Sequence, residues 1–488
     1  MAIRSLDLAR WARPVLGEEG IATIHAASLS VLSRTGVRVY SRRILAELRR
    51  AGMPVDEERE LVRIPAEHVE AALRAAPRSY ILAGREPELD LPLDGTRGFL
   101  SVDGSAAEVL DLETGLRRPS TSVDLVAVTR LADALPEIGF LWQGAEAGDV
   151  PAAFRPLHEM RIQLTHSSKH VQLMTAVTPQ VAEGAVAMAA TVAGGLDALR
   201  ARPILSTFQV SLSPLAFEGQ ALEAALVYAR AGVPAGFVVM PITCATAPAT
   251  TAGTIVQSNA ELLAGITILE TLVPGALTFY GACPTVMDLR TALIAAGGPE
   301  DALFQLALSE LGHHYGLPTS IGTFATGAKR PDWQSSLENT LSGFASLLGG
   351  AEMLSGAGLL HAARVFSLQQ MVLDTEIFGL LCRFADGIDL GAEELALDVI
   401  DDVGPGGNFL SEYHTVRTMR RLWQPRFFDR GTWEAWDEAG RPDPADRARD
   451  LVRELLAAHE PAPLPGGVAE DLDRIVAEHE RRAAVAPG

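Results

Sequence analysis

FLSVDG, residues 99–104, is the first of eight short apolar runs along this chain, and the series decides the fold. Longer stretches with helical spacing separate the runs, so strands and helices alternate as they do around a parallel sheet. Eight such units close most naturally into a (β/α)8 or TIM barrel, an α/β fold, with a doubly wound open sheet as the alternative. The other seven runs are IGFLWQG (138–144), HVQLMTAV (170–177), PILSTFQVS (203–211), AGFVVMPI (235–242), ALTFYGA (276–282), LPTSIGTF (317–324) and MLSGAGL (353–359).

The rest of the chain divides around this barrel. We assign residues 1–98 to an N-terminal helical flanking region, 99–400 to the barrel, and 401–488 to a C-terminal extension that ends in a tail helix near 471–484. Helical spacing at 21–52 and 65–76 predicts the flanking helices. Within the barrel, SVDLVAVTRLADAL (122–135) and GTIVQSNAELLAGITILETL (253–272) are expected crossover helices.

Composition narrows the classes of function. The 488 residues carry a formal charge of −20, which repels a phosphate backbone, so we expect no nucleic-acid partner. The N-terminal residues lack the apolar segment of a signal peptide, and prolines interrupt the long uncharged stretch 231–260. Three scattered cysteines are too few for a disulfide framework. We therefore expect a cytoplasmic protein without a membrane helix.

Functional side chains of a barrel come from the C-terminal ends of its strands and the loops after them. Trp142, Tyr280 and Phe324 fall at or near such ends in a chain that has only 6% aromatic residues. Aromatic faces bind quaternary ammonium groups, although rings at these positions also fill the upper layer of a barrel. Phe208 and Gln209 are consecutive, so at most one of them faces inward.

The signals for other chemistry are weaker. Cys244 and Cys283 follow consecutive strands and could approach each other as zinc ligands, but there is no CxxC motif and we expect no metal. His166 and His170 precede their strand and belong at the opposite end of the barrel. Asp374 and Glu376 follow the eighth strand, where a solvated helix face is the expected position.

Five long segments, found in the same order along the chain, carry a resemblance to a known family: TGLRRPSTSVDLVAVTRLADALPEI (114–138), ATAPATTAGTIVQSNAELLAGI (245–266), FATGAKRPDWQ (324–334), SLQQMVLDTEI (367–377) and DVIDDVGPGGNFLSEYHTVRTMRRLWQPRFFDR (398–430). They resemble the trimethylamine methyltransferase family, and the resemblance runs from about residue 20 to 450. It implies a TIM barrel that transfers a methyl group from a methylated amine to cob(I)alamin on a separate corrinoid protein. It thus implies no cofactor bound tightly to this chain, and a homo-oligomer is expected.

The family includes members with pyrrolysine in the active site, at a place that corresponds here to about Thr323 to Thr326, and this sequence contains none. Without it, demethylation of neutral trimethylamine would expel an amide anion, whereas a quaternary amine leaves as a neutral tertiary amine. The protein then mainly positions the methyl group and excludes water. Glycine betaine or a related betaine is the substrate that this chemistry and the similar pyrrolysine-free relatives imply.

In this hypothesis Trp142, Tyr280 and Phe324 surround the ammonium group. The carboxylate would be anchored by one or more of Gln143, Gln209, His361 and Arg364. The basic segment HTVRTMRRLW (414–423) suggests that His414 and Arg417 face the corrinoid protein, with a solvated helix as the simpler interpretation. The alternative functions are a zinc-dependent thiol or cobalamin methyltransferase that uses Cys244 and Cys283, and a non-catalytic betaine-binding barrel.

Overall fold

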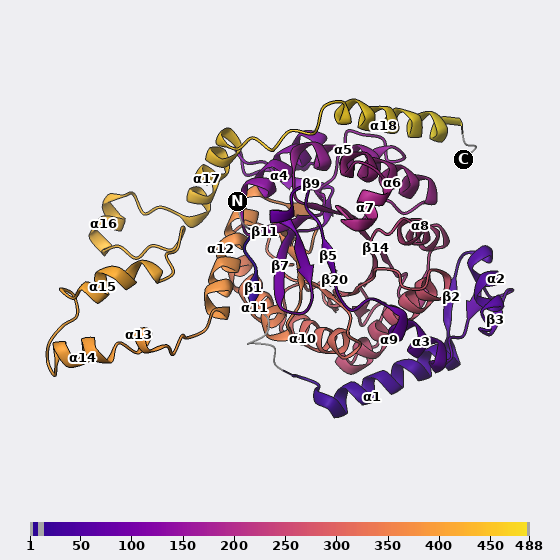
Figure 1. Cartoon of the computed structure of the whole chain (residues 1–488), viewed down its shortest axis with the longest axis horizontal. Helices are drawn as coiled ribbons and strands as arrows, with labels where there is room; N and C mark the ends of the chain where they lie inside the picture. Colours follow the sequence, from indigo (N-terminus) through magenta and orange to yellow (C-terminus); the bar gives the residue numbers. More distant parts are fainter. Residues whose placement is uncertain (1–2, 8–13, 486–488) are drawn as a thin grey trace.

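The structure, a computed structural model, describes residues 3–7 and 14–485. Its central sheet joins a short antiparallel strand, β1 (Leu6–Asp7), to eight parallel strands that close into a barrel (Figure 1). Closure comes from the parallel pairing of the last strand with the first, where Leu354 lies opposite Leu100. The predicted TIM barrel is confirmed, and the alternative prediction of a doubly wound open sheet is wrong. In barrel order the strands are β7 (Arg97–Val102), β11 (Ile138–Leu141), β13 (His170–Leu173), β14 (Leu205–Val210), β16 (Ala235–Val239), β18 (Tyr280–Ala282), β21 (Thr319–Gly322) and β22 (Met353–Ala357).

Helices follow every barrel strand and cover its outer face. The predicted helices at 122–135 and 253–272 are confirmed within two residues, and the first begins with a capping box between Thr121 and Asp124. The helices are α4 (Ser122–Ala134), α5 (Arg155–His166), α6 (Pro179–Ala193), α7 (Leu196–Ala201), α8 (Gly219–Arg230), α9 (Thr251–Leu272), α10 (Pro299–His314), α11 (Trp333–Gly349) and α12 (Leu368–Ala385).

The barrel interior is filled from its N-terminal end. Phe99 and Phe140 face inward from their strands and pack with Leu82 and Leu91. These two leucines belong to a hairpin of β5 (Tyr80–Leu82) and β6 (Leu91–Leu93), and the 3-10 turn η2 (Pro87–Leu89) lies between its strands. Apolar side chains therefore occupy this end, and space for a ligand is left toward the other end.

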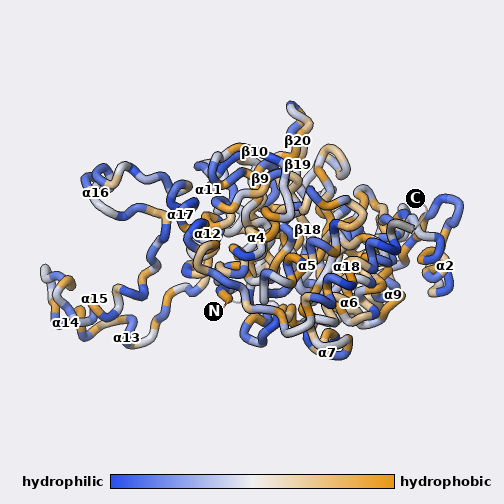
Figure 2. Tube along the Cα trace, turned by 90° about the horizontal axis from the view of Figure 1, so that it is seen from above, coloured by the Kyte–Doolittle hydropathy of each residue, from blue (hydrophilic) through white to orange (hydrophobic). Residues whose placement is uncertain are grey.

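Short strands and hairpins extend the loops at the C-terminal end of the barrel, where β9, β10, β19 and β20 stand together in Figure 2. One small sheet has the order β10-β9-β24-β23 and joins the loop after β7 to the loop after β22. The strands are β8 (Ser105–Ala106), β9 (Glu108–Leu110), β10 (Arg117–Pro119), β12 (Gly144–Ala145), β15 (Ala216–Phe217), β17 (Ile242–Thr243), β19 (Thr285–Asp288), β20 (Leu293–Ile294), β23 (Leu359–Leu360) and β24 (Val365–Phe366).

The N-terminal region packs against the outside of the barrel, and the helix expected over 21–52 is interrupted. Gly36 has a φ of 76°, and a Cβ there would lie 2.4 Å from the carbonyl oxygen of Val62, so the chain turns into a strand instead. The elements are α1 (Gly17–Ser30), the π-helix η1 (Val31–Thr35), β2 (Val37–Val39), α2 (Arg42–Arg50), β3 (Val55–Asp56), β4 (Leu61–Val62) and α3 (Ala66–Ala75).

Residues 386–441 form a segment that we call the arm, which projects sideways from the barrel in both views (Figures 1 and 2). Phe427 is its one buried residue. The chain then returns to the barrel: α17 (Pro444–Ala458) packs on α12, and α18 (Val468–Val485) lies along α6 and α5. The arm contains α13 (Ala392–Leu395), α14 (Leu397–Val403), α15 (Tyr413–Thr418), the 3-10 turn η3 (Met419–Arg421) and α16 (Trp433–Glu438). Among the helices of the described residues, none has the length and apolar character to cross a membrane.

Candidate functional site

A cavity of about 420 Å³ lies among residues that end the barrel strands and begin the following loops, a volume suited to a small organic ligand. It reaches solvent, because Met240 and Ile294 line it and are both 43% exposed. Apolar side chains make up most of its wall. The polar and charged lining residues are Asp103, Ser105, Cys283, Thr285, Asp301, Gln305, Ser320, Ser342 and Ser355.

Trp142, Phe208 and Phe304 line the cavity with aromatic rings, and the first two form a pair. The indole of Trp142, directly after β11, lies with its centroid 4.6 Å from that of Phe208 on β14. The Nε1 atom of Trp142 donates a hydrogen bond of 2.5 Å to Gln172 Oε1, which fixes the orientation of the indole. Such a pair offers aromatic faces to a cation inside the barrel.

Two buried carboxyl groups also line the cavity. Asp103 follows β7 and is 9% exposed, and burial raises its pKa to about 7 although the Gly104 amide donates to it. Asp301, in the first turn of α10, accepts hydrogen bonds from the Gly297 amide (2.8 Å) and the Thr285 hydroxyl (3.3 Å). Burial raises the pKa of Asp301 to about 6.

Acceptor oxygens without donors accompany these carboxyl groups. Asp301 Oδ1 and Gln305 Oε1 are buried and have no hydrogen-bond partner within the described part of the chain. The amide nitrogen of Gln305 is used, because it donates to Gly322 and Ser342. The described lining residues include no Arg, Lys or His. The cavity is thus rich in acceptors and negative charge, which suits a cation.

Tyr280 and Phe324, which we predicted beside Trp142, lie outside this cavity. Tyr280 is fully buried against the outer helices, and its hydroxyl donates to Asn259 of α9. Its neighbours Gly281 and Cys283 take the inward positions because side chains alternate along β18. Phe324 packs beneath α11 and α12, near Gly343 and Leu381. These two rings therefore do not form part of the cavity wall, and Trp142 is joined there by Phe208 instead.

Gln143 and Gln209 do not line the cavity either. The Gln143 amide donates to the Thr175 hydroxyl at 3.0 Å. Gln209 points away from the inward-facing Phe208, as alternation requires, and lines a hollow beside α8, where neither of its amide atoms has a hydrogen-bond partner among the described residues. Anchoring of a carboxylate inside the cavity by these two residues therefore has no support in the geometry.

His361 and Arg364 lie at the edge of the cavity. They line a neighbouring hollow of about 410 Å³, which shares Ser105 and Ala363 with the cavity. His414 and Arg417 lie on the arm, away from the cavity, and Arg417 is paired there with Glu393. The cavity and its edge thus bring together three of the predicted residues: Trp142, His361 and Arg364.

The two cysteines of the zinc hypothesis differ in environment: Cys244 is exposed, while Cys283 lines the cavity. Burial and the negative charges of Asp103 and Asp301 raise the pKa of Cys283, which disfavours the thiolate that zinc binds. Within residues 3–7 and 14–485, no group of three or more His, Cys, Asp or Glu side chains is arranged to hold a metal ion.

The expectation that Asp374 and Glu376 are solvated is wrong. Asp374 is fully buried and accepts hydrogen bonds from Asn339, Gln370 and the Gly358 amide. Glu376 is 4% exposed and pairs with Arg426 at 3.2 Å. The two carboxylates attach α12 to the loop after β22 and to the base of the arm.

Asp103 belongs to the first apolar run, FLSVDG, but we did not predict it to bind the substrate, and we did not predict Asp301 at all. The signal for Asp103 was its position directly after FLSV. Asp301 comes from the first turn of a helix, where an acidic residue is ordinarily explained by the helix dipole. Only the folded barrel brings both carboxyl groups to one cavity.

These features define a TIM-barrel enzyme whose cavity, at the C-terminal ends of the strands, suits a small organic cation. Among solved structures, the Methanosarcina barkeri monomethylamine methyltransferase has the same fold, with a TM-score of 0.55, 14% identity, and coverage of 93% of this chain and 89% of that one. A hydroxylamine complex of the same kind of enzyme gives a TM-score of 0.56 with the same identity and coverage.

Sequence comparison is more specific. The family model for trimethylamine methyltransferase matches residues 9–484. A trimethylamine methyltransferase of Desulfitobacterium hafniense is 34% identical over 96% of this chain and 94% of its own length. A glycine betaine methyltransferase of the same species is 30% identical, over 95% and 96%. The chain belongs to the trimethylamine methyltransferase family and is a methyltransferase.

Proposed function

We propose that this enzyme moves a methyl group from a cationic methylated amine to cob(I)alamin carried by a separate corrinoid protein. The observation that carries the proposal is the cavity itself: its described lining residues provide an aromatic pair, two carboxyl groups and acceptor oxygens without described partners, and none of them is basic. The relatives named for trimethylamine and for glycine betaine support a methylated amine as the substrate class.

A quaternary amine fits the groups in this cavity. Its nitrogen has no proton to donate, so it binds through charge and aromatic faces, which Asp103, Asp301, Trp142 and Phe208 provide. Its positive charge makes a neutral tertiary amine the leaving group, so no residue has to protonate the nitrogen during transfer. The tasks of the chain are to orient one methyl group toward the mouth and to exclude water.

The corrinoid, when bound to its own protein, supplies the cobalt nucleophile. We place the corrinoid protein at the mouth of the barrel, where the exposed side chains of Met240 and Ile294 lead into the cavity. This choice replaces docking at His414 and Arg417, because the arm lies to the side of the barrel and the guanidinium of Arg417 is already paired.

For the arm we propose a second copy of this chain as the partner. A monomer seldom leaves so many large apolar side chains in water. The same chain has a second exposed apolar surface, because Trp333, Leu337 and Leu341 are exposed on α11 at intervals of four residues and share one face. A permanent partner suits such apolar surfaces better than a corrinoid protein that must leave after each turnover. The exposed arm residues include Ile388, Leu390, Leu395, Leu397, Ile400, Phe409, Leu410, Tyr413 and Trp433.

The test of the function is methylation of free cob(I)alamin by the purified enzyme. We expect the absorption spectrum of methylcobalamin to develop with at least one member of a panel of trimethylamine, glycine betaine and longer betaines. Tight binding of a betaine without methylcobalamin would favour the non-catalytic barrel. Turnover that is abolished by a chelator and restored by zinc would favour the zinc-dependent alternative.

A further inference from the structure

We propose that the hollow beside the cavity is a carboxylate subsite, and that the substrate is a zwitterion with its carboxylate several bonds from its quaternary nitrogen. This inference rests on the proposed function and deepens it. It follows from the opposite charges of the two adjoining spaces and from the way the fold holds the positively charged one.

The cavity is unsuited to a carboxylate next to the ammonium group. Asp103 and Asp301 line it, and no described lining residue is basic. In glycine betaine a single carbon separates the nitrogen from the carboxylate. If its nitrogen lay against Trp142 and Phe208, its carboxylate would remain in the same space, without a cationic partner and close to two acids. Burying an unpaired anion is strongly unfavourable.

The neighbouring hollow carries the opposite charge. Arg117, His361 and Arg364 line it, and among its described lining residues only Glu108 is acidic. Glu108 lies 3.4 Å from Arg117, which leaves Arg364 without an acidic partner among the described residues. Burial lowers the pKa of His361, and the charges of Lys329, Arg364 and Arg117 lower it further, so three cationic groups lie around this imidazole. In a chain with a net charge of −20, this concentration of positive charge is local and unusual.

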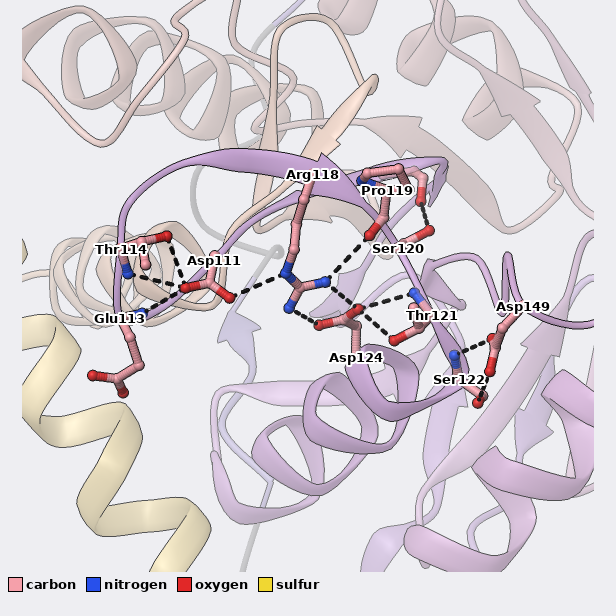
Figure 3. A network of polar contacts seen from close by, with 11 residues as sticks. Asp111, Glu113, Thr114, Arg118, Pro119, Ser120, Thr121, Ser122, Asp124 and Asp149 are labelled. Carbon is pink, nitrogen blue, oxygen red and sulfur yellow. Dashed lines mark hydrogen bonds and ion pairs between the residues drawn. The ribbon is translucent and has the colours of Figure 1, made fainter.

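The fold fixes the strand that bears Arg117. The next residue, Arg118, donates from Nε to Asp111 at 3.0 Å and from both terminal nitrogens to Asp124 at 2.8 Å (Figure 3). Adjacent side chains of a strand point to opposite faces. The ion pairs of Arg118 therefore hold β10 against the N-terminus of α4 and leave Arg117 on the other face, where it lines the hollow.

The turn that bears His361 and Arg364 is held in a strained conformation. His361, Ala362 and Ala363 all have positive φ values, of 52°, 52° and 67°, which non-glycine residues rarely adopt and still more rarely in succession. Backbone hydrogen bonds to Ala328 (2.7 Å) and Thr326 (2.9 Å) keep the turn in place. Strain that the surrounding structure maintains in this way is typical of binding sites.

Ser105 and Ala363 line both spaces, so the cavity and the hollow adjoin at these two residues, and in our proposal one ligand extends from one space to the other. The pair of spaces presents negative charge inside and positive charge at the rim. This arrangement matches a molecule with a trimethylammonium group at one end and a carboxylate at the other. A spacer longer than one carbon is needed to cross the boundary that the two shared residues form.

The test compares the binding of 4-(trimethylammonio)butanoate, its methyl ester, glycine betaine and tetramethylammonium by calorimetry. We expect the butanoate to bind more tightly than its ester and than glycine betaine. Arg364→Ala should raise the Kd of the butanoate about tenfold or more, since hydrogen bonds to charged groups are worth at least that much. It should change the Kd of tetramethylammonium less than about twofold, as expected of a screened charge at the rim.

Matched variants separate the subsite from general effects. Arg330→Ala removes an exposed arginine that lines neither space, and it should leave both affinities unchanged. Arg364→Lys should recover part of the lost affinity. Equal binding of the acid and its ester, or equal weakening of all ligands by Arg364→Ala, would overturn the subsite. So would unchanged binding of the butanoate together with a higher KM for the corrinoid protein, which would assign the charges to partner docking. Failure of the proposed function differs from these results, because no ligand would then yield methylcobalamin.

Discussion

The indole ring of Trp142 and the phenyl ring of Phe208 lie 4.6 Å apart between centroids, with their planes inclined at 41°. Trp142 directly follows β11 and Phe208 belongs to β14, and these strands are not neighbours in the barrel because β13 lies between them. Gln172 of β13 accepts the hydrogen bond that orients the indole. Residues from three strands, or directly after them, thus hold one aromatic surface in the wall of the cavity.

Removing the indole should weaken the binding of a trimethylammonium group. We expect Trp142→Ala to raise the Kd of tetramethylammonium by about 2- to 30-fold, the range that corresponds to a cation–π contact, and Trp142→Phe to raise it less. Calorimetry measures both. Tyr280→Phe is the control, because the Tyr280 hydroxyl bonds to Asn259 outside the cavity and its loss should leave the Kd unchanged. A higher Kd for Tyr280→Phe together with an unchanged Kd for Trp142→Ala would instead assign Tyr280 to the binding site.

The binding of a cation should depend on pH through Asp103. Its pKa in the folded protein is raised to about 7, so the carboxylate is protonated below that pH and loses the charge that attracts the ligand. The Kd of tetramethylammonium should therefore rise by about tenfold between pH 8 and pH 6. Asp301, with a pKa of about 6, faces the same cavity and extends the loss to lower pH.

Two variants assign this dependence. Asp103→Asn should bind the cation weakly at both pH values and lose the change near pH 7. Asp301→Asn should keep the change in Kd near pH 7 and lose only the further change at lower pH. A pH profile that is the same in Asp103→Asn and in the unaltered enzyme would exclude Asp103 as the titrating group.

Phe324 should contribute to stability rather than to recognition of the amine. It is fully buried between α11 and α12, so Phe324→Ala should lower the free energy of unfolding by about 3–5 kcal/mol, measured by urea denaturation. Phe324→Leu keeps more of the contact and serves as the milder variant if the first does not fold. A Phe324→Leu enzyme with unchanged stability and impaired amine binding would contradict this assignment.

Assembly should depend on the apolar residues of the arm. We expect Leu397→Glu combined with Leu410→Glu to reduce the molar mass measured by light scattering to that of a monomer, because buried carboxylates would lack partners. Ser411→Glu is the control, since it adds a charge at an exposed polar position of the same segment. If the unaltered chain is already monomeric at micromolar concentration, the proposed second copy is wrong.

Several parts of the fold were predictable because they depend on short-range pattern. Each of the eight barrel strands was read from an apolar run bounded by turn residues, and the helix at 122–134 from its cap and spacing. The interruption of the helix expected over 21–52 was not predictable, because the turn at Gly36 depends on a contact with Val62, which is distant in sequence.

The candidate site was less predictable. A residue near a strand end can face into the barrel or away from it, and a shift of one position along the strand reverses the direction of its side chain. Trp142 lies inside and Tyr280 outside for this reason, although both rings come from the ends of apolar runs. Asp301 reaches the cavity only because the first turn of α10 lies beside it, and the sequence alone does not distinguish this carboxyl group from an ordinary acidic residue at a helix N-terminus.

The sequence by itself therefore determined the barrel, the number and order of its strands, and membership of a methyltransferase family, because periodic burial and long ordered motifs are written along the chain. Only the tertiary structure decided which side chains share the cavity, that acidic groups lie within it and basic groups beside it, and that the arm extends away from the barrel. Those properties depend on strand register and on contacts between residues far apart in sequence, which no local pattern encodes.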